Sequence, residues 1–187
     1  MPRPPMIPVP DWSAICQAGL TWTDWLAQAE SADQAARMKE RFETLQVPQP
    51  LKAKLAALSA PTHVVAIAED WCGDVVRHAP VIARIAHEQP LVKLRFITRD
   101  HDLALFTRFL TNGGEAIPKF IFLNDAFTEY GNWGPMQTDA RHLIAQGKAL
   151  NDVGAARKLV SELYSADPQC ETAFRELIDL AAMPSGG

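Results

Sequence analysis

The sequence contains few cysteines. Only Cys16, Cys72 and Cys170 occur among its 187 residues, and they lie far apart in the chain. An odd number of widely spaced cysteines argues against a disulfide scaffold and favours a reducing compartment, so we expect a cytoplasmic protein. No two cysteines have the spacing of metal ligands, and the five histidines form neither an HExxH motif nor a Cys-x-x-His group. We therefore expect no metal site and no cofactor.

The chain also lacks an excess of positive charge and a long apolar run. It has 18 Lys and Arg against 22 Asp and Glu, which gives a formal net charge of -4. This balance provides no electrostatic reason to expect nucleic acid or an anionic membrane as a partner. No stretch approaches the roughly 18 apolar residues that a membrane-spanning helix needs. The proline-rich residues 1–10 lack the continuous apolar segment of a secretory signal, and we expect them to form an extended tail.

What the chain does contain is enough apolar residues, 48%, to bury a sizeable core. Their spacing predicts helices throughout residues 11–59, with a break at Pro48 and Pro50. The pattern changes at residue 62, where the β-branched run THVVAIA suits a strand covered on both faces.

From residue 62 onward, predicted strands and helices alternate in the order β-α-β-α-β-β. The strands are expected at 62–68, 91–98, 118–124 and 127–133, and the helices between them at 72–87 and 101–110. A strand, a crossover helix and a second strand imply a parallel pair, and the closing hairpin adds two strands, one of them antiparallel to that pair. Further helices are expected over 138–148, 152–164 and 168–182. The fold class is therefore α/β, with a four-stranded mixed sheet and helices on both faces.

The stretch EDWCGDVVRHAP (69–80) places Cys72 directly after a predicted strand and at the start of a helix. Unpaired N–H groups and the helix dipole favour a thiolate there, and they can lower a cysteine pKa from about 8.5 to roughly 3.5–7.5. Three neighbouring acids, Glu69, Asp70 and Asp74, act in the opposite direction. We expect Cys72 to be moderately activated at most.

Four features of this region resemble the thioredoxin fold. The Trp71-Cys72-Gly73 turn follows a buried strand and opens a helix. Pro80 lies eight residues beyond the cysteine, where thioredoxins have a proline that bends the active-site helix. Ile117-Pro118 begins the third strand, where thioredoxins have a cis-proline facing the redox cysteine. The fourth feature is the order of elements, and the resemblance covers roughly residues 62–135.

The parts outside this region are similar to a subgroup of thioredoxin-like bacterial proteins with a WCGD motif, which often lack the second cysteine. The Trp133-Gly134-Pro135 turn is also similar to that subgroup. The resemblance implies a thioredoxin-like fold with an N-terminal helical extension and C-terminal helices. We expect the tail at residues 1–10, the helical extension packed on the core at 11–60, and the thioredoxin-like domain at 61–187, together forming one compact unit.

The chain departs from thioredoxins at two positions. Val75 stands where a dithiol enzyme has its second cysteine, and Ala66 stands where thioredoxins have a buried acid that helps to move protons. A mixed disulfide on Cys72 must therefore be resolved by glutathione, by a partner protein, or by Cys16 or Cys170 if the fold brings one of them near. Both departures argue against full thioredoxin-type turnover.

Two functions from different classes remain open. In the first, Cys72 forms mixed disulfides with a protein or a low-molecular-weight thiol or disulfide. In the second, the chain is a redox-inactive module that binds a peptide or protein in the groove beside Pro118. A third, weaker hypothesis is a glutathione- or cluster-binding role like that of monothiol glutaredoxins, from whose pattern the Trp-Cys-Gly-Asp turn departs. The candidate site residues are Cys72 as the catalytic thiol and Trp71, Gly73, Asp74, Ile117 and Pro118 as substrate-binding residues.

Each of these residues also has a structural alternative. Cys72 can be a small buried core residue, and Pro118 can be a trans-proline at the start of an edge strand. His78 lies about 240° around the helix from Cys72, which favours a surface position. Cys16 and Cys170 are expected to be inert packing residues. Nothing in the sequence indicates an oligomeric state.

Overall fold

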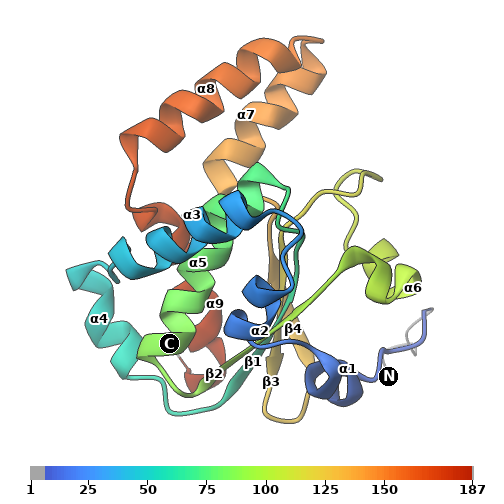
Figure 1. Ribbon diagram of the computed structural model, residues 1–187, viewed down its shortest axis with the longest axis vertical. Helices are drawn as coiled ribbons and strands as arrows, with labels where there is room; N and C mark the ends of the chain where they lie inside the picture. Colours follow the sequence, from blue (N-terminus) through green and yellow to red (C-terminus); the bar gives the residue numbers. More distant parts are fainter. Residues whose placement is uncertain (1–6, 187) are drawn as a thin grey trace.

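The computed structural model describes residues 7–186 (Figure 1). The helices are α1 (Trp12–Ala18), α2 (Trp22–Ala27), α3 (Ala32–Thr44), α4 (Gln49–Ala56), α5 (Gly73–Glu88), α6 (Leu103–Thr107), α7 (Thr138–Ala149), α8 (Val153–Ala166) and α9 (Glu171–Ala182). The strands are β1 (Thr62–Ile67), β2 (Val92–Ile97), β3 (Lys119–Asn124) and β4 (Glu129–Trp133). Most of the predicted tail lies outside the described residues, and residues 7–10 have no regular secondary structure.

The four strands form one mixed sheet in the order β2-β1-β3-β4. β1 lies between a parallel neighbour, β2, and an antiparallel neighbour, β3, while β4 pairs antiparallel with β3. β1 and β3 are buried almost throughout, and β2 alternates between buried Val92 and Leu94 and exposed Lys93. These patterns place β1 and β3 in the interior of the sheet, covered on both faces.

Helices cover both faces of the sheet (Figure 1). The helices α3, α4, α5 and α9 lie to one side, and α1 and α6 lie to the other. The apolar stripe of α5 includes Val75, Ala79 and Ile82, which are fully buried. The predicted four-stranded mixed sheet with flanking helices is therefore confirmed.

The N-terminal helices are held against the edge of the sheet by caps and aromatic packing. Thr21 and Ser31 cap α2 and α3, each accepting a hydrogen bond from a backbone N–H in the first turn of its helix. Leu20 and Phe96 form an antiparallel bridge that extends the sheet beyond β2. The Trp25 ring stacks on Phe96 with 4.6 Å between the ring centroids, so the tryptophans of this region serve packing.

The helix expected at 101–110 is shorter in the structure. A 3-10 turn occupies Arg99–His101, and α6 begins only after Asp102, whose carboxylate accepts a hydrogen bond from the Leu105 N–H at 3.0 Å. The chain leaves the helix after Thr107, and a tight turn follows in which Asn112 has a φ of 52°. The prediction of a helix over 101–110 was wrong at both ends, since the Asp102 cap starts the helix at Leu103 and it ends at Thr107, ahead of the Asn112 turn.

Helices α7 and α8 form a hairpin that extends from the molecule near the start of α5 (Figure 1). Gly147 of α7 lets the two helices approach closely, because a Cβ there would collide with the Ala156 side chain and lie 2.9 Å from the Asp152 carbonyl oxygen. At its other end α8 is fixed to α5, since the Arg77 guanidinium lies over the Tyr164 ring, 4.1 Å from its centroid.

We expect the Gly147→Ala substitution to lower the free energy of unfolding by about 1–3 kcal/mol, because the added methyl group overpacks the α7–α8 contact. Urea denaturation followed by circular dichroism measures this change. Gly154→Ala is the matched control on α8, where a Cβ would meet nothing closer than 3.7 Å. An equal loss of stability in both variants would contradict the close approach at Gly147.

Candidate functional site

Cys72 lies at the junction between the sheet and α5. After β1 the chain turns through residues 68–72, and the Cys72 N–H donates to the Glu69 carbonyl at 3.2 Å. Cys72 is the N-cap residue of α5, because its carbonyl accepts the hydrogen bond from Val76 N–H at 2.9 Å. Its side chain is half-buried, so the thiol is neither sealed in the core nor fully open to solvent.

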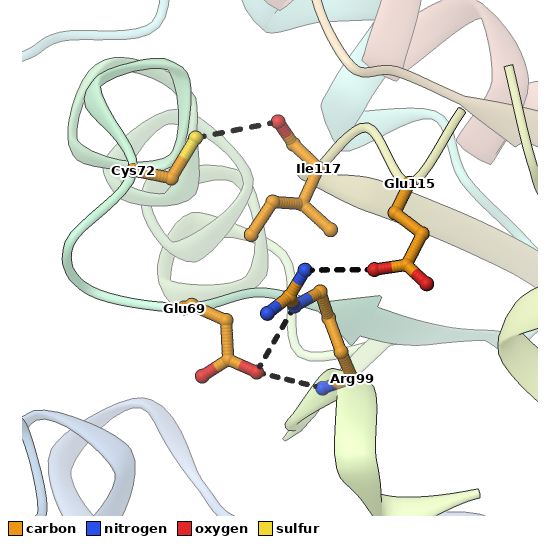
Figure 2. A network of polar contacts seen from close by, with 5 residues as sticks. All are labelled: Glu69, Cys72, Arg99, Glu115 and Ile117. Carbon is orange, nitrogen blue, oxygen red and sulfur yellow. Dashed lines mark hydrogen bonds and ion pairs between the residues drawn. The ribbon is translucent and has the colours of Figure 1, made fainter. Parts of the chain in front are cut away.

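The sulfur of Cys72 faces the segment that precedes β3. Its thiol donates a weak hydrogen bond to the Ile117 carbonyl oxygen at 3.5 Å (Figure 2). The Ile117–Pro118 peptide bond is cis, and Ile117 is only 4% exposed. Pro118 is buried beneath this contact. The thiol therefore faces a carbonyl group, which favours its protonated form.

Burial raises the pKa of Cys72 above its ordinary value, and the charge of Asp74 raises it further. The backbone N–H groups of Val75 and Asp74 and the charge of Arg99 lower the pKa, but they do not outweigh burial. The helix N-terminus thus acts on the thiol in the expected direction. Its effect is smaller than the cost of placing a thiolate in a half-buried position.

The other two acids of the turn are engaged elsewhere. The Glu69 carboxylate accepts a hydrogen bond from Arg99 N–H at 2.8 Å, and the Arg99 side chain continues to the Glu115 carboxylate at 3.1 Å (Figure 2). Asp70 is 5% exposed and accepts a hydrogen bond from Ser31 N–H at 2.7 Å, which ties α3 to the turn. Both carboxylates therefore hold the loops around the thiol.

Trp71 is the exposed aromatic residue beside the thiol. Its side chain is 52% exposed, and the Arg99 guanidinium lies 5.1 Å from the centroid of its ring. Because Arg99 is also bound by Glu69 and Glu115, the cation–π contact holds the indole in place beside Cys72.

Asp74 connects α5 to the α7–α8 hairpin. Its carboxylate accepts a hydrogen bond from the Tyr164 hydroxyl at 2.9 Å. Burial raises the pKa of Asp74, while this hydrogen bond and the nearby Arg77 lower it. The contact places a carboxylate beside Cys72, where it opposes thiolate formation.

His78 is fully buried, which corrects the expected surface position. Its Nδ1 lies 2.9 Å from the Asp74 carbonyl oxygen, and its ring packs edge-on against Trp133 and Tyr164. The helical angle from Cys72 was a poor guide because Trp133 of β4 and Tyr164 of α8 cover this side of α5. Burial lowers the pKa of His78 to about 3, so the ring is neutral.

A cavity of about 720 Å³ opens beside the thiol. Trp71, Cys72, Asp74 and Ile117 all line it, so four of the six candidate residues share one cavity. Gly73 and Pro118 do not line it. The rest of the lining is Thr111, Asn112, Gly114, Glu115, Ala116, Pro135, Met136, Arg141, His142, Ile144, Ala145, Lys148, Val153, Arg157 and Val160.

The wall formed by α7 and α8 was not found from the sequence. Its residues lie 69 or more positions beyond Cys72, and no short motif marks them. A usable signal was the spacing of Arg141 and Lys148, which are seven residues apart and therefore share one face of a helix. Only the docking of α8 through Tyr164 turns that face toward the thiol.

The segment before β3, which forms another wall of the cavity, is fixed by hydrogen bonds from Lys119. The Lys119 ammonium donates to the Thr111 hydroxyl at 2.7 Å and to the Gly134 carbonyl at 3.1 Å. Gly134 has a φ of +120°, and a Cβ there would collide with the Pro118 carbonyl oxygen. Burial lowers the pKa of Lys119 to about 8. Lys119 thus ties two loops that line the cavity.

Neither of the other cysteines lines the cavity. Cys170 is fully buried at the start of α9, where its sulfur accepts a hydrogen bond from the Arg41 guanidinium at 3.1 Å. Cys16 is 8% exposed in α1. Among residues 7–186 no group of three or more His, Cys, Asp or Glu side chains is arranged to hold a metal ion. No helix within that range is both long and apolar enough to span a bilayer.

We expect iodoacetamide to alkylate Cys72 with an inflection at higher pH than for a free cysteine, because burial disfavours the thiolate. Mass spectrometry of the Cys72 peptide at each pH measures the rate. The Asp74→Asn variant keeps an acceptor for Tyr164 but removes a negative charge, so its inflection should move to lower pH. An unchanged inflection in this variant would show that Asp74 does not act on the thiol.

We expect stability to fall as the pH decreases from about 6.5 toward 3, partly because of His78. The unfolded state binds a proton at this residue below its ordinary pKa of about 6.5, whereas the folded state does so only near 3. The contribution is at most about 1.4 kcal/mol per pH unit within that window. Urea denaturation across this pH range should show a shallower fall for His78→Phe than for the native protein. His101→Phe, at an exposed position, is the control and should leave the slope unchanged.

Comparison with known proteins agrees with this architecture. The crystal structure of a protein of unknown function from Pseudomonas aeruginosa has a TM-score of 0.74, covering 96% of this chain and 100% of that one at 15% identity. An HIV epitope scaffold has a TM-score of 0.67, with 95% and 99% coverage and 18% identity. At these identities the likeness concerns the fold alone. No curated protein matches the sequence. A family model described as thioredoxin matches residues 19–149, well over half of the chain, and the chain therefore belongs to the thioredoxin family.

Proposed function

We propose that the protein takes part in thiol–disulfide exchange through a mixed disulfide on Cys72. The observation that carries the proposal is the position of this sulfur, which lines a cavity of about 720 Å³ together with Trp71 and Ile117. A cavity of this size can enclose a small ligand or the end of a protein side chain. The partner is a low-molecular-weight disulfide or a protein disulfide.

The step balances without a cofactor. The Cys72 thiolate attacks one sulfur of the disulfide, a new S–S bond forms to Cys72, and the other sulfur leaves as a thiolate that takes up a proton. The two electrons of the attacking sulfur thus pass to the leaving one. Regeneration requires a second thiol from outside the chain, because Val75 replaces the second cysteine and neither Cys16 nor Cys170 lines the cavity.

The raised pKa of Cys72 determines which kind of exchange this site favours. At neutral pH only a small fraction of the thiol is ionised, so attack on a disulfide is slow. Once the mixed disulfide has formed, Cys72 is a poor leaving group, because thiols of higher pKa leave more slowly. We infer a protein that holds a partner thiol as a persistent mixed disulfide rather than one that turns over rapidly.

The WCGD turn and the lost second cysteine fit the subgroup of thioredoxin-like bacterial proteins that the sequence resembles. Within residues 7–186 all three cysteines are free, which is consistent with a reducing compartment such as the cytoplasm. In such a compartment abundant small thiols are available to resolve the adduct.

A second candidate function is a redox-inactive binding module. The observation in its favour is the same raised pKa, together with the hydrogen bond from the thiol to the Ile117 carbonyl. In this case the cavity binds its partner without a covalent step, and replacing the thiol by a hydroxyl should leave binding intact.

The two candidates are separated by exposing the protein to bis(2-hydroxyethyl) disulfide at pH 8 and measuring the intact mass. Thiol exchange predicts one adduct per chain, located on Cys72 by peptide mapping and removed by an excess of reduced thiol. The Cys72→Ser variant is the control and should form none, since the two remaining cysteines are buried. Failure of Cys72 to form an adduct, in protein that remains folded, would rule out the exchange and leave the binding module.

A further inference from the structure

We propose that the Cys72 cavity selects a small disulfide or thiol that carries carboxylate groups, and that the α7–α8 hairpin supplies this selectivity. The inference rests on the proposed exchange at Cys72 and names the class of its partner. The hairpin places Arg141, Lys148 and Arg157 in the lining of the same cavity as the thiol.

The charge of the cavity is opposite to that of the chain. The whole sequence has 18 cationic against 22 acidic residues, whereas the lining has three cationic residues and two acidic ones, Asp74 and Glu115. Glu115 forms an ion pair with Arg99, which lies outside the lining, so Arg99 offsets part of the Glu115 charge. Asp74 accepts a hydrogen bond from Tyr164 and keeps its negative charge beside the thiol. The cationic groups therefore act on the part of a ligand that lies away from Cys72, along α7 and α8.

The three hairpin cations that line the cavity have no acidic partner within residues 7–186. Among the described residues, none of the ion pairs involves Arg141, Lys148 or Arg157. The Arg141 guanidinium donates to the Thr138 hydroxyl at 2.9 Å and to the Gly134 carbonyl at 3.2 Å, so it is fixed in place while keeping its charge. Lys148 and Arg157 are exposed at the rim. The 16-residue helix α5 also directs the positive end of its dipole toward this region.

The remainder of the lining is largely apolar and suits a ligand whose sulfur and carboxylate groups are joined by an aliphatic chain. Ile144, Ala145, Val153 and Val160 supply apolar surface from α7 and α8, and Met136 adds more from the preceding turn. The volume of about 720 Å³ lies within the usual range for sites that enclose small ligands. The volume of the cavity, its apolar walls and the cations at its rim match a low-molecular-weight thiol or disulfide with carboxylate groups at its ends.

An extended peptide is a poorer match for this site. Strand-like docking beside Cys72 requires open backbone next to the thiol, but Ile117 is only 4% exposed and its carbonyl already accepts the thiol hydrogen bond. Pro118 is buried and does not line the cavity. Residues of the hairpin line the same cavity as the 111–117 segment, so they narrow the space beside Cys72 further.

The test compares three disulfides that differ in charge: 3,3′-dithiodipropionic acid, bis(2-hydroxyethyl) disulfide and cystamine. The rate of Cys72 adduct formation is measured by mass spectrometry at low salt, and each rate is divided by that of the same disulfide with 2-mercaptoethanol, a reference thiol without a charged group. We expect the normalised rate for the dicarboxylate to exceed that for cystamine by about tenfold, and the difference to shrink as salt is added.

Charge reversal on the hairpin provides the matched controls. Lys148→Glu and Arg157→Glu should each reduce the preference for the dicarboxylate by about fivefold. Lys158→Glu makes the same change at an exposed neighbouring position of α8 that does not line the cavity, and it should leave the preference unchanged. Equal normalised rates for all three disulfides would overturn the selectivity while leaving the exchange itself standing.

If Cys72 reacts with none of the disulfides, the proposed exchange fails, and the selectivity is decided by non-covalent binding. The probe is then S-methylglutathione, which carries carboxylates but has no free thiol or disulfide. Salt-sensitive binding by calorimetry that is weakened in Lys148→Glu and Arg157→Glu, but not in Lys158→Glu, supports an anion-selective cavity. Absence of binding, or equal binding in all variants, overturns it.

Discussion

The contact between the Cys72 thiol and the Ile117 carbonyl joins the two segments on which the site depends. One is the start of α5, which follows the C-terminal end of β1, and the other is the cis-proline segment that leads into β3. Because β1 and β3 are hydrogen-bonded neighbours, the sheet itself fixes how close these segments lie. The sulfur can therefore reach only those partners that enter between them, and everything else around the site determines the shape and charge of that entrance. Glu69 and Asp70 contribute by binding neighbouring loops rather than by acting on the thiol.

The balance of forces on the Cys72 thiol bears on what a site with Val75 in place of a second cysteine can do. In a dithiol site a low pKa serves rapid attack and rapid release, and the second thiol completes the cycle. Here the N–H groups at the start of α5 still favour the thiolate, but burial, Asp74 and the facing carbonyl favour the protonated form. A sulfur of raised pKa reacts slowly, but it also leaves slowly. Val75 stands in place of a resolving thiol and Ala66 in place of a buried acid, so the exchange proposed above would give a persistent adduct rather than rapid turnover.

The sequence was a good guide wherever local pattern and long-range structure agree. The buried run of β1 and the alternation of β2 predicted strands that form within one residue of the expected ends. It was a poor guide where packing from a distant segment decides the outcome. His78 was placed at the surface because only its own helix was considered, yet β4 and α8 bring Trp133 and Tyr164 against it. The α6 helix was predicted too long because the apolar periodicity continues through Phe109 and Leu110, whereas the helix ends at Thr107.

For the same reason the sequence did not reveal the part of the cavity that α7 and α8 form. This part bears on which ligands the site can distinguish. Cys72, Trp71 and Ile117 could be named from a family pattern, whereas Lys148 and Arg157 could not, since only the docking of α8 onto α5 brings them near the thiol. The sheet, the turn and the cis-proline segment are shared with a large family, so they cannot by themselves distinguish one disulfide from another. The hairpin is where this chain adds charge to that common framework. The approach of an uncharged molecule to Cys72 depends on the shape of the cavity, whereas the approach of a charged molecule also depends on Arg141, Lys148 and Arg157. The proposed selectivity rests on this second dependence.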